Sequence, residues 1–518
     1  MDLLRPRVDR GIVCDMDTAQ HGGRQAPLAM DADTFRQIGH DLVDRVAAFL
    51  QTLPQRPVTR DQSPSAVREA LDLNGPLPEH GTAPGPLLAQ TTNGLIEHSL
   101  FNGHPRFFGY ITAAPAPIGI LGDFLAAAIN ANVGAWTLGP AASEIESQTV
   151  RWIAELIGYP SSCGGVMVSG GNMANFVCFW AARAAKATWN IRQDGLTGSQ
   201  TRPLRIYGSA ETHTWIRKAA DLAGLGTASI RWIPAGADQR MDIDALRRTM
   251  AADVAAGDLP FMVVGTAGSV STGAIDSLRT IAAVCKEHGA WFHVDGAYGG
   301  FAAASPEAPA DLRDLSEADS VAVDPHKWLY APLEAGCALV RDPEHLRAAF
   351  AYHPPYYHFE EEATNYVDRG PQNSRGFRAL KVWLALRQVG AAGYRTMISD
   401  DIRLARALVE EVQRTPELEW LTHSLSITTF RYIPPDLRAT IGEPATETQL
   451  DAINRELLDR LQRGGELFVS NAVINGRYAL RACIVNFHTS REDIAAVPEI
   501  VVRVGRAVDA GRVKLQTR

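Results

Sequence analysis

Between residues 164 and 323, short apolar runs alternate with amphipathic segments along the chain. The apolar runs predict strands at residues 164–168, 204–207, 261–264, 291–294 and 320–323. The segments between them have helical periodicity, most clearly at residues 172–186, 213–222 and 278–288. Strands and helices that alternate through short connections are typical of a mostly parallel sheet with helices on both faces. The pattern therefore predicts an α/β fold with its ligand site outside the carboxyl ends of the strands.

Other patterns flank this region. An amphipathic helix is predicted from Asp31 up to Pro54, because apolar residues recur at three- and four-residue steps. A Pro- and Gly-rich stretch follows at residues 54–86, and it is too poor in apolar residues to form its own core. A long segment without periodicity, residues 352–376, predicts a lid, and a long helix from about residue 392 leads into mixed strands and helices. We therefore expect four parts: a loose arm (1–29), an N-terminal helical and extended segment (30–115), a large domain (116–390) and a small C-terminal domain (391–518).

A further helix is predicted at residues 143–158. Ser143 is placed at its N-cap, and Glu146 three residues later completes a capping box. This interpretation gives Glu146 a structural role rather than a catalytic one.

Composition narrows the class of protein. Hydrophobic residues make up 46% of the 518 residues and charged residues 21%, as in globular proteins. The net charge of −8 gives no electrostatic reason to expect binding to nucleic acid or to an anionic membrane. The N-terminus lacks the apolar core of a signal peptide, and no run is long enough to span a bilayer. The six scattered cysteines indicate free thiols in a reducing cytoplasm and no metal site.

The stretch ADSVAVDPHKW, residues 318–328, carries the most specific chemistry. Its apolar run ends in Asp324 and Pro325 and places Lys327 at the exit of a predicted strand. Partial burial of a lysine favours the neutral amine, which is the form that attacks a carbonyl carbon. Asp295 lies 32 positions upstream, at the end of another predicted strand. A carboxylate and a lysine at neighbouring strand ends could hold opposite ends of pyridoxal 5′-phosphate (PLP), with Asp295 on the ring nitrogen and Lys327 on the aldehyde.

Two further features agree with such a site. Ser169, Gly170, Gly171 and Asn172 link a strand to a helix, so their backbone N–H groups could bind a phosphate at the helix N-terminus. When these residues are considered alone, a tight turn is the simpler explanation. His213, near the start of the next predicted helix, could stack on a pyridine ring or serve a structural purpose.

These residues resemble the group II PLP-dependent amino-acid decarboxylases, and above all those that act on aromatic amino acids. The similarity runs from about Phe35 to Val508 and includes HPRFFGY at residues 104–110 and the Asp295-Gly-Ala-Tyr segment. It implies PLP-dependent transferase fold type I, a homodimer with active sites at the subunit interface, and an N-terminal segment that clasps the partner subunit. It also implies that Lys327 carries the internal aldimine, that His213 stacks on the ring, and that phosphate and ring are bound by Gly170, Gly171, Asn172, Asp295, Ala297 and His326.

The resemblance implies a reaction and a set of substrate contacts. Loss of CO₂ would leave a carbanion that the ring absorbs as a quinonoid, and Tyr366 in the predicted lid would protonate it. With Lys327, His213 and Asp295, Tyr366 completes the expected catalytic set. The expected substrate pocket consists of Phe108, Tyr110, Ile111, Thr112 and Trp136.

Three activities stay open at this point. The first is decarboxylation of an aromatic amino acid: tryptophan, tyrosine, DOPA or phenylalanine. The second is decarboxylation of glutamate or aspartate, which needs a free arginine in the pocket, with Arg106 and Arg375 as candidates. The third is aldehyde synthesis, which a protonating Tyr366 disfavours. Asn132 and Gly134 depart from the bulky apolar residues of the family's pocket wall, and Asp324 stands close to the expected phosphate.

Overall fold

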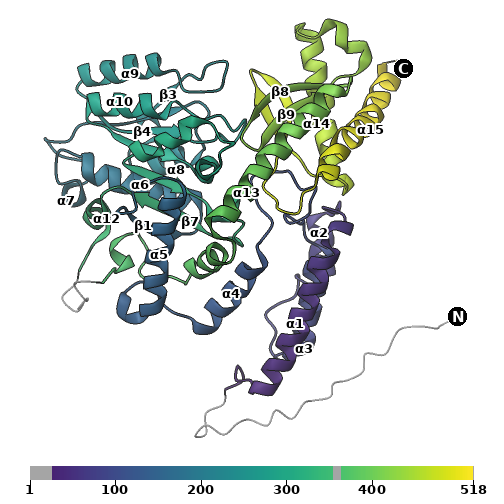
Figure 1. Ribbon diagram of the computed structural model, residues 1–518, viewed down its shortest axis with the longest axis horizontal. Helices are drawn as coiled ribbons and strands as arrows, with labels where there is room; N and C mark the ends of the chain where they lie inside the picture. The colour runs from purple at the N-terminus through teal and green to yellow at the C-terminus, as the bar shows by residue number, and fades with distance from the viewer. Residues whose placement is uncertain (1–25, 354–362, 517–518) are drawn as a thin grey trace. The chain divides into compact units, whose positions relative to one another are not determined.

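The computed structural model describes residues 26–353 and 363–516 (Figure 1). The chain forms two compact units, Met1–Thr52 with Gln62–Ser99, and Leu53–Asp61 with Leu100–Arg518. Most of the expected N-terminal arm and residues 354–362 of the expected lid lie outside the described residues. None of the described helices combines the length and the apolar character needed to cross a membrane.

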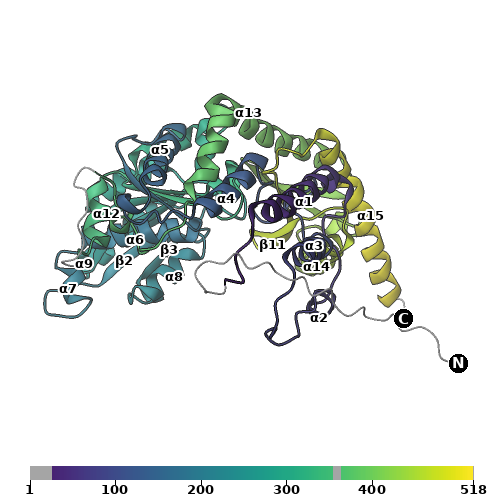
Figure 2. The same cartoon turned by 90° about the horizontal axis from the view of Figure 1, so that it is seen from below.

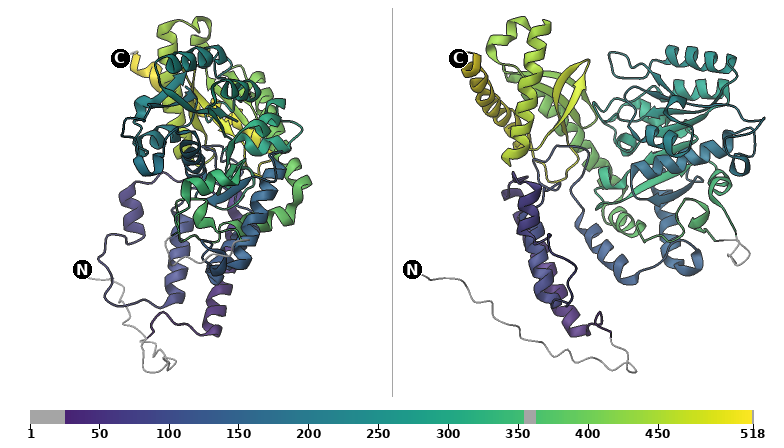
Figure 3. Two further views of the ribbon diagram at one scale, coloured as in Figure 1. Left: turned by 90° about the vertical axis from the view of Figure 1, so that its left-hand side faces the viewer. Right: turned by 180° about the vertical axis from the view of Figure 1, so that it is seen from behind.

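The first unit contains helices α1 (Ala32–Thr52), α2 (Pro64–Ala70) and α3 (Pro84–Glu97). The predicted helix after Asp31 is confirmed as α1, which lies beside α3 (Figure 3). No residue of α1 is buried, and Phe35 and Val43 are each more than half exposed. A helix that leaves its apolar side chains uncovered gains little stability from packing within its own chain.

The second unit contains a seven-stranded sheet in the order β1-β7-β6-β5-β4-β2-β3. Its strands are β1 (Gly164–Val168), β2 (Leu204–Ser209), β3 (Ile230–Ile233), β4 (Leu259–Thr266), β5 (Trp291–Asp295), β6 (Ser320–Val323) and β7 (Gly336–Val340). All neighbours pair in parallel except β7, which is antiparallel to both β1 and β6. The predicted mostly parallel sheet is therefore confirmed, and β3 and β7 are strands that the sequence pattern did not predict.

Alternate residues of these strands serve two separate cores. Met167 and Val263 point into one core, and their neighbours Val166 and Val264 point into the other. The first core is completed by α5 (Pro140–Leu156), α9 (Ile243–Ala255) and α10 (Leu278–His288). The second is completed by α6 (Gly171–Lys186), α8 (Trp215–Leu222) and α12 (Pro343–Phe350) (Figure 1). Burial on both faces explains why the strands are continuous apolar runs.

A long helix, α13 (Ala379–Arg414), connects the large sheet to a smaller α/β region. It is kinked at Gly390, whose φ of 68° is not helical, so the long helix expected from about residue 392 is the second part of a longer, interrupted element. Figure 2 shows α13 along both α5 and α15 (Arg491–Gln516). A four-stranded antiparallel sheet, in the order β10-β11-β9-β8, packs with α14 (Pro444–Gly464), α15 and the second half of α13. Its strands are β8 (Leu418–Ser424), β9 (Ile427–Tyr432), β10 (Ser470–Ile474) and β11 (Arg477–Cys483).

Candidate active site

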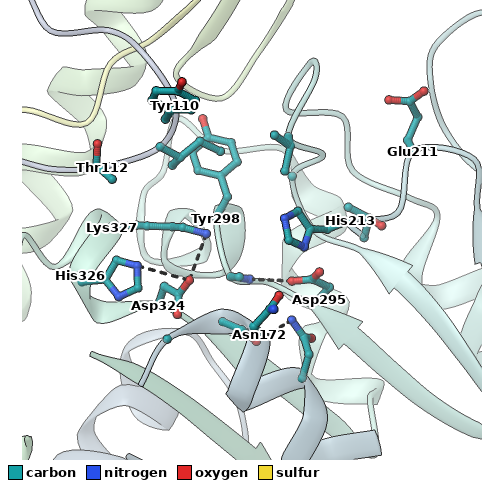
Figure 4. Close-up of a pocket in the computed structure, with 18 of the residues that line it drawn as sticks. Tyr110, Thr112, Asn172, Glu211, His213, Asp295, Tyr298, Asp324, His326 and Lys327 are labelled. Atoms are coloured by element: carbon teal, nitrogen blue, oxygen red, sulfur yellow. Dashed lines mark hydrogen bonds and ion pairs between the residues drawn. The ribbon is translucent and has the colours of Figure 1, made fainter. Parts of the chain in front are cut away.

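A cavity of about 420 Å³ lies in the second unit, at the carboxyl ends of β4, β5 and β6 and at the start of α6 (Figure 4). This is the edge at which a mostly parallel sheet is expected to hold its ligand. Twenty residues form its wall: Tyr110, Ile111, Thr112, Ser169, Gly170, Gly171, Asn172, Asn175, Glu211, His213, Thr266, Gly268, Val270, Asp295, Ala297, Tyr298, Asp324, His326, Lys327 and Arg481. The expected phosphate, ring and lysine residues are thus together in one cavity.

Lys327 belongs to α11 (Pro325–Trp328), a single helical turn directly after β6. The residues after it hold this turn in place, because Trp328 Nε1 and Tyr330 Oη both donate hydrogen bonds to Asp401 Oδ2, at 2.8 and 2.7 Å. The amine itself reaches into the cavity and lies 3.0 Å from Asp324 Oδ2. A rigid backbone therefore presents a lysine whose reactive end is accessible.

Asp295 ends β5 and is almost fully buried, at 7% exposure. Its Oδ2 accepts a hydrogen bond from Trp215 Nε1 at 2.8 Å, and its Oδ1 accepts one from the backbone of Ala297 at 3.2 Å. Hydrogen bonds to a carboxylate favour its ionised form. The side chain is thus fixed in orientation, with both oxygens satisfied before any ligand binds.

A chain of hydrogen bonds lies behind Asp295. Trp291 Nε1 donates to Ser320 Oγ at 2.8 Å, so the Ser320 hydroxyl is free to donate to His293 Nδ1. His293 Nε2 then carries the proton that Asn175 Oδ1 accepts at 2.7 Å, and the Asn175 amide donates to the carbonyl of Gly171. Burial lowers the pKa of His293 to about 4, so this imidazole is neutral and does not cancel the charge of Asp295. This series of hydrogen bonds also connects β5 to the first turn of α6.

His213 lies between β2 and α8 and opens into the cavity (Figure 4). Its Nδ1 accepts a hydrogen bond from the backbone of Trp215 at 3.3 Å, which places the proton of the neutral ring on Nε2. Burial lowers the pKa of His213 below its ordinary value. A neutral, flat ring opposite Lys327 is suited to stacking on an aromatic ligand.

Donors suited to an anion surround the N-terminus of α6. Gly170 has a φ of +107°, which a residue with a side chain rarely adopts, and no side chain caps the helix. The first N–H groups of this helix are therefore directed at the cavity without a capping partner. His326 also borders this end, and its Nδ1 lies 2.7 Å from the carbonyl oxygen of Ala335.

Only three of the five residues expected to form the substrate pocket line the cavity. Tyr110, Ile111 and Thr112 line the cavity, and the Tyr110 ring lies 6.2 Å from that of Phe468. Phe108 does not line it. Its side chain is fully buried in the core of the small α/β region, and the chain turns at Tyr110, whose φ is +50°.

Trp136 also lies away from the cavity wall. Its ring nitrogen donates to Glu144 Oε1 at 2.8 Å, and its backbone N–H donates to Asn365 Oδ1 at 3.0 Å. The contact with Glu144 holds the Trp136 side chain against the first turns of α5. The substrate contacts expected from Phe108 and Trp136 are therefore not part of this cavity.

Tyr366, the expected proton donor, also lies away from the cavity wall. Its side chain is completely buried in the core between α5, β1 and β7, and the guanidinium of Arg375 lies 4.7 Å from the ring centre. Burial raises the pKa of its hydroxyl well above the usual value. In the described structure the Tyr366 hydroxyl therefore does not reach this cavity, and its role as proton donor stays a prediction.

Glu146 and the two candidate arginines have structural partners. Helix α5 begins at Pro140, so Ser143 is inside the helix and the capping box does not form. Glu146 is instead buried, where it pairs with Arg375 at 2.6 Å and accepts from the backbone of Met167. Arg106 pairs with Asp493 at 3.0 Å, outside the cavity wall.

Sequence reasoning overlooked Arg481 and Trp215. Arg481 lies in the apolar strand β11, and its guanidinium donates to Ser470 Oγ and to the carbonyl of Val270. Burial lowers the pKa of Arg481, and no described carboxylate pairs with it. A charged residue inside the apolar run of residues 478–485 was the available signal. For Trp215, the signal was its position two residues after His213.

Comparison with known proteins identifies the family. Residues 78–433 match the pyridoxal-dependent decarboxylase conserved domain. An aromatic-L-amino-acid decarboxylase of Bacillus atrophaeus is 31% identical, and the alignment covers 91% of this chain and 95% of that protein. A phenylacetaldehyde synthase of a Rosa hybrid cultivar is 27% identical over 95% of this chain and 98% of its own. The crystal structure of Oryza sativa TDC with PLP and tryptamine superposes with a TM-score of 0.85, at 28% identity, over 93% of this chain and 99% of that one.

The chain therefore belongs to the pyridoxal-dependent decarboxylases, and it is a PLP-dependent amino-acid decarboxylase. The cavity fits this cofactor on its own evidence. Three buried side-chain oxygens on its wall have no hydrogen-bond partner: Thr112 Oγ1, Thr266 Oγ1 and Asp324 Oδ1. Unpaired buried polar atoms in a cavity indicate that a polar ligand satisfies them.

Proposed function

We propose that the protein decarboxylates an aromatic L-amino acid to the corresponding amine and CO₂. Tryptophan, tyrosine, DOPA and phenylalanine are the candidate substrates. The cavity offers the faces of Tyr110 and His213 and the aliphatic side chains of Ile111 and Val270 to a flat, apolar group. The relatives named above include an aromatic-L-amino-acid decarboxylase and a structure that holds tryptamine.

The observation that carries this proposal is the small number of positively charged side chains on the cavity wall. Lys327 and Arg481 are the lysine and arginine on its wall, and Lys327 is committed to the cofactor. Every amino-acid substrate has an α-carboxylate. Arg481 is suited to bind it, because its guanidinium is buried and no described carboxylate pairs with it. When Arg481 binds that group, no arginine of the described cavity wall is left for an acidic side chain.

The proposed roles of the other residues follow from their positions. When bound, PLP withdraws the electrons that the departing CO₂ leaves at Cα. Lys327 binds the aldehyde carbon, and Asp295 keeps the ring nitrogen protonated through charge pairing. His213 stacks on the ring, and Ala297 leaves room beside it. The N–H groups of Gly170, Gly171 and Asn172, with His326, hold the phosphate.

The proton delivered at Cα has to come from a group that reaches the cavity. His213 and Lys327 do so, whereas Tyr366 does not. Burial lowers the pKa of His213, so its neutral ring has no extra proton to deliver. We therefore assign the proton donor to Lys327 after substrate has released it from the cofactor.

Product analysis tests the proposed substrate class. The PLP-loaded protein is incubated with all twenty amino acids, and amines are identified by mass spectrometry. We expect tryptamine, tyramine or phenylethylamine to dominate. Formation of γ-aminobutyrate or β-alanine as the main product would overturn the assignment.

Substitution of Arg481 separates the aromatic from the acidic alternative. If Arg481 binds the α-carboxylate, Arg481→Gln raises KM by about tenfold or more for every substrate, because each loses the same charged contact. If it binds an acidic side chain, the loss is confined to glutamate and aspartate. Arg106→Gln is the matched control, since Arg106 pairs with Asp493 outside the cavity wall.

Aldehyde synthesis is the remaining alternative, and the similarity to a phenylacetaldehyde synthase keeps it open. It differs in stoichiometry, because oxidative deamination consumes O₂ and releases ammonia and peroxide. We expect the amine to equal the CO₂ released, with no peroxide above background. Equal yields of aldehyde and peroxide would instead assign the protein to that activity.

We also propose that the protein is a homodimer with active sites at the subunit interface. Helix α1 has no buried residue, and α4 (Pro117–Ile129) exposes Leu121, Phe124 and Ile129, each by more than half. Uncovered apolar side chains on helices are typical of surfaces that another chain covers. Sedimentation should give a mass near twice 56.1 kDa, and deletion of residues 31–90 should abolish both dimer and activity. A fully active monomer would contradict this proposal.

A further inference from the structure

The phosphate end of the cavity contains an unusual carboxylate, that of Asp324. It is 2% exposed, and its Oδ2 lies 3.0 Å from Lys327 Nζ and 3.7 Å from His326 Nε2 (Figure 4). Its Oδ1 is buried without any hydrogen-bond partner. A buried carboxylate with a free oxygen is costly unless a ligand or a proton satisfies it.

Asp324 also lies directly against the residues that bind phosphate. A Cβ atom on Gly171 would be 2.6 Å from Asp324 Oδ2, so this carboxylate touches the first residue of α6. A phosphate held by the N–H groups of Gly170 and Gly171 has to lie next to it. At neutral pH this brings a phosphate dianion and a carboxylate together in a buried place, where like charges repel strongly.

The neighbouring residues of α11 do not compensate for this repulsion. The ammonium of Lys327 offsets one of the three negative charges that Asp324 and a phosphate dianion bring together, so a net charge of about −2 remains even before the amine binds the aldehyde carbon. His326 Nδ1 lies 2.7 Å from the carbonyl oxygen of Ala335, so it is the protonated nitrogen and leaves Nε2 bare toward Asp324. Burial also lowers the pKa of His326 and keeps the ring neutral.

Among the described residues, the other elements around Asp324 add no free cation either. Burial lowers the pKa of His213 across the cavity, and burial raises the pKa of Cys337 on β7, so both are neutral. Lys381 on α13 is paired with Asp123 at 3.1 Å. The remaining way to remove the repulsion is a proton.

We propose that binding of the phosphate ester is coupled to the uptake of one proton, which Asp324 shares with the bound phosphate. This inference rests on the proposed phosphate-binding residues. The proton comes from solvent, forms an O–H bond at Asp324 Oδ2, the oxygen that lies against Gly171, and is donated in a hydrogen bond to a phosphate oxygen. No electrons are transferred. Asp324 thus makes cofactor loading depend on pH.

The proton uptake is measured by titration calorimetry of the full-length chain stripped of PLP. The ligand is pyridoxine 5′-phosphate, which has the phosphate but no aldehyde and so cannot react with Lys327. Titration at pH 8 in buffers of different ionisation enthalpy counts the protons. We expect the wild type to take up about one proton more than Asp324→Asn, whose amide can donate to the phosphate without a proton. Between pH 7 and 9 the wild-type Kd should rise by up to about tenfold per pH unit more steeply than that of the variant.

Two controls isolate the effect. Glu334→Gln removes one exposed negative charge from the nearby loop and should leave proton uptake unchanged. Pyridoxine, which lacks the phosphate, should show no difference between the wild type and Asp324→Asn.

Equal proton uptake and equal pH slopes in the wild type and Asp324→Asn would overturn the inference. If Asp324→Asn does not fold, the wild type alone decides, because no proton uptake above pH 8 is incompatible with the coupling. Failure of the wild type to bind pyridoxine 5′-phosphate at any pH would count against the phosphate-binding residues instead.

Discussion

The two ends of the cavity each contain a buried carboxylate, and the two differ in how they are satisfied. At the ring end, both oxygens of Asp295 accept hydrogen bonds, from Trp215 and Ala297. At the phosphate end, one oxygen of Asp324 is paired with Lys327 and the other has no partner. Both side chains are less than a tenth exposed, so the difference comes from their partners and not from depth.

This difference separates a fixed charge from an adjustable one. Hydrogen bonds from Trp215 and Ala297 fix the orientation of Asp295, as is needed by a group that pairs with a ring nitrogen. Asp324 loses the ammonium of Lys327 as its ion-pair partner when that amine reacts, and it comes to lie beside the negative phosphate when the cofactor binds. Its protonation therefore has to change during cofactor loading. The same residue type serves two purposes because the surrounding donors differ.

The largest expected effect is that of Asp295→Asn. The amide keeps the shape but removes the charge opposite the ring nitrogen. Loss of one partner of a buried ion pair costs about 3–5 kcal/mol, which corresponds to a kcat lower by roughly 10²- to 10⁴-fold. PLP should still bind, as its absorbance will show.

The same substitution at Asp324 tests the contrast between the two ends. Asp324→Asn should lower kcat near pH 7 by less than about tenfold, because its amide can still contact the phosphate. Equal losses of kcat in Asp295→Asn and Asp324→Asn would contradict the distinction between a fixed and an adjustable charge.

Trp215→Phe should have an intermediate effect. It removes the N–H donor at 2.8 Å from Asp295 Oδ2 and leaves the backbone donor of Ala297 in place. Loss of a hydrogen bond to a charged group costs about 1.5–3 kcal/mol, so we expect kcat to fall by about tenfold or more. Trp232→Phe, at a partly exposed position, is the matched control.

A smaller effect concerns Asp401, which anchors the turn that carries Lys327. Burial raises the pKa of Asp401 to about 7, so the folded protein binds a proton here that the unfolded chain releases near pH 4. Its contribution to stability therefore falls as pH rises from about 4 to 7 and is constant above that. Asp401→Asn cannot ionise. Relative to the wild type, its free energy of unfolding should rise by roughly 1 kcal/mol or more between pH 5 and pH 8, measured by urea denaturation. A difference independent of pH would show that Asp401 is ionised throughout.

The smallest effect is expected for Tyr366→Phe. Its buried hydroxyl has no hydrogen-bond partner, so its removal should change kcat by less than about twofold and leave the amine as the product. Loss of amine with release of aldehyde and peroxide would instead restore Tyr366 as the proton donor.

The sequence predicted the large sheet because its strands are buried on both faces and appear as continuous apolar runs. Strands β3 and β7 escaped prediction for different reasons. In β3, Arg231 and Trp232 interrupt the apolar pattern at the edge of the sheet. β7 follows a loop instead of a helix and runs antiparallel, which the alternation of strands and helices cannot indicate.

The site was predictable where residues adjoin a strand end, as with Asp295, Lys327 and Gly170. Prediction failed where the position of a side chain depends on tertiary packing. Phe108 and Tyr110 are two residues apart, yet one is in a core and the other in the cavity. Arg481 comes from a distant strand that only the folded chain brings to the site. Local sequence cannot specify such long-range neighbours.

Covalent attachment of the cofactor at Lys327 is the claim on which the roles of both carboxylates depend. Borohydride treatment of the PLP-loaded protein makes the bond between lysine and cofactor permanent, and peptide mapping by mass spectrometry then locates it. We predict a single pyridoxyl group on Lys327 and none in Lys327→Ala. A label on another lysine, such as Lys218 or Lys381, or a label that persists in Lys327→Ala, would contradict the assignment of this cavity as the active site.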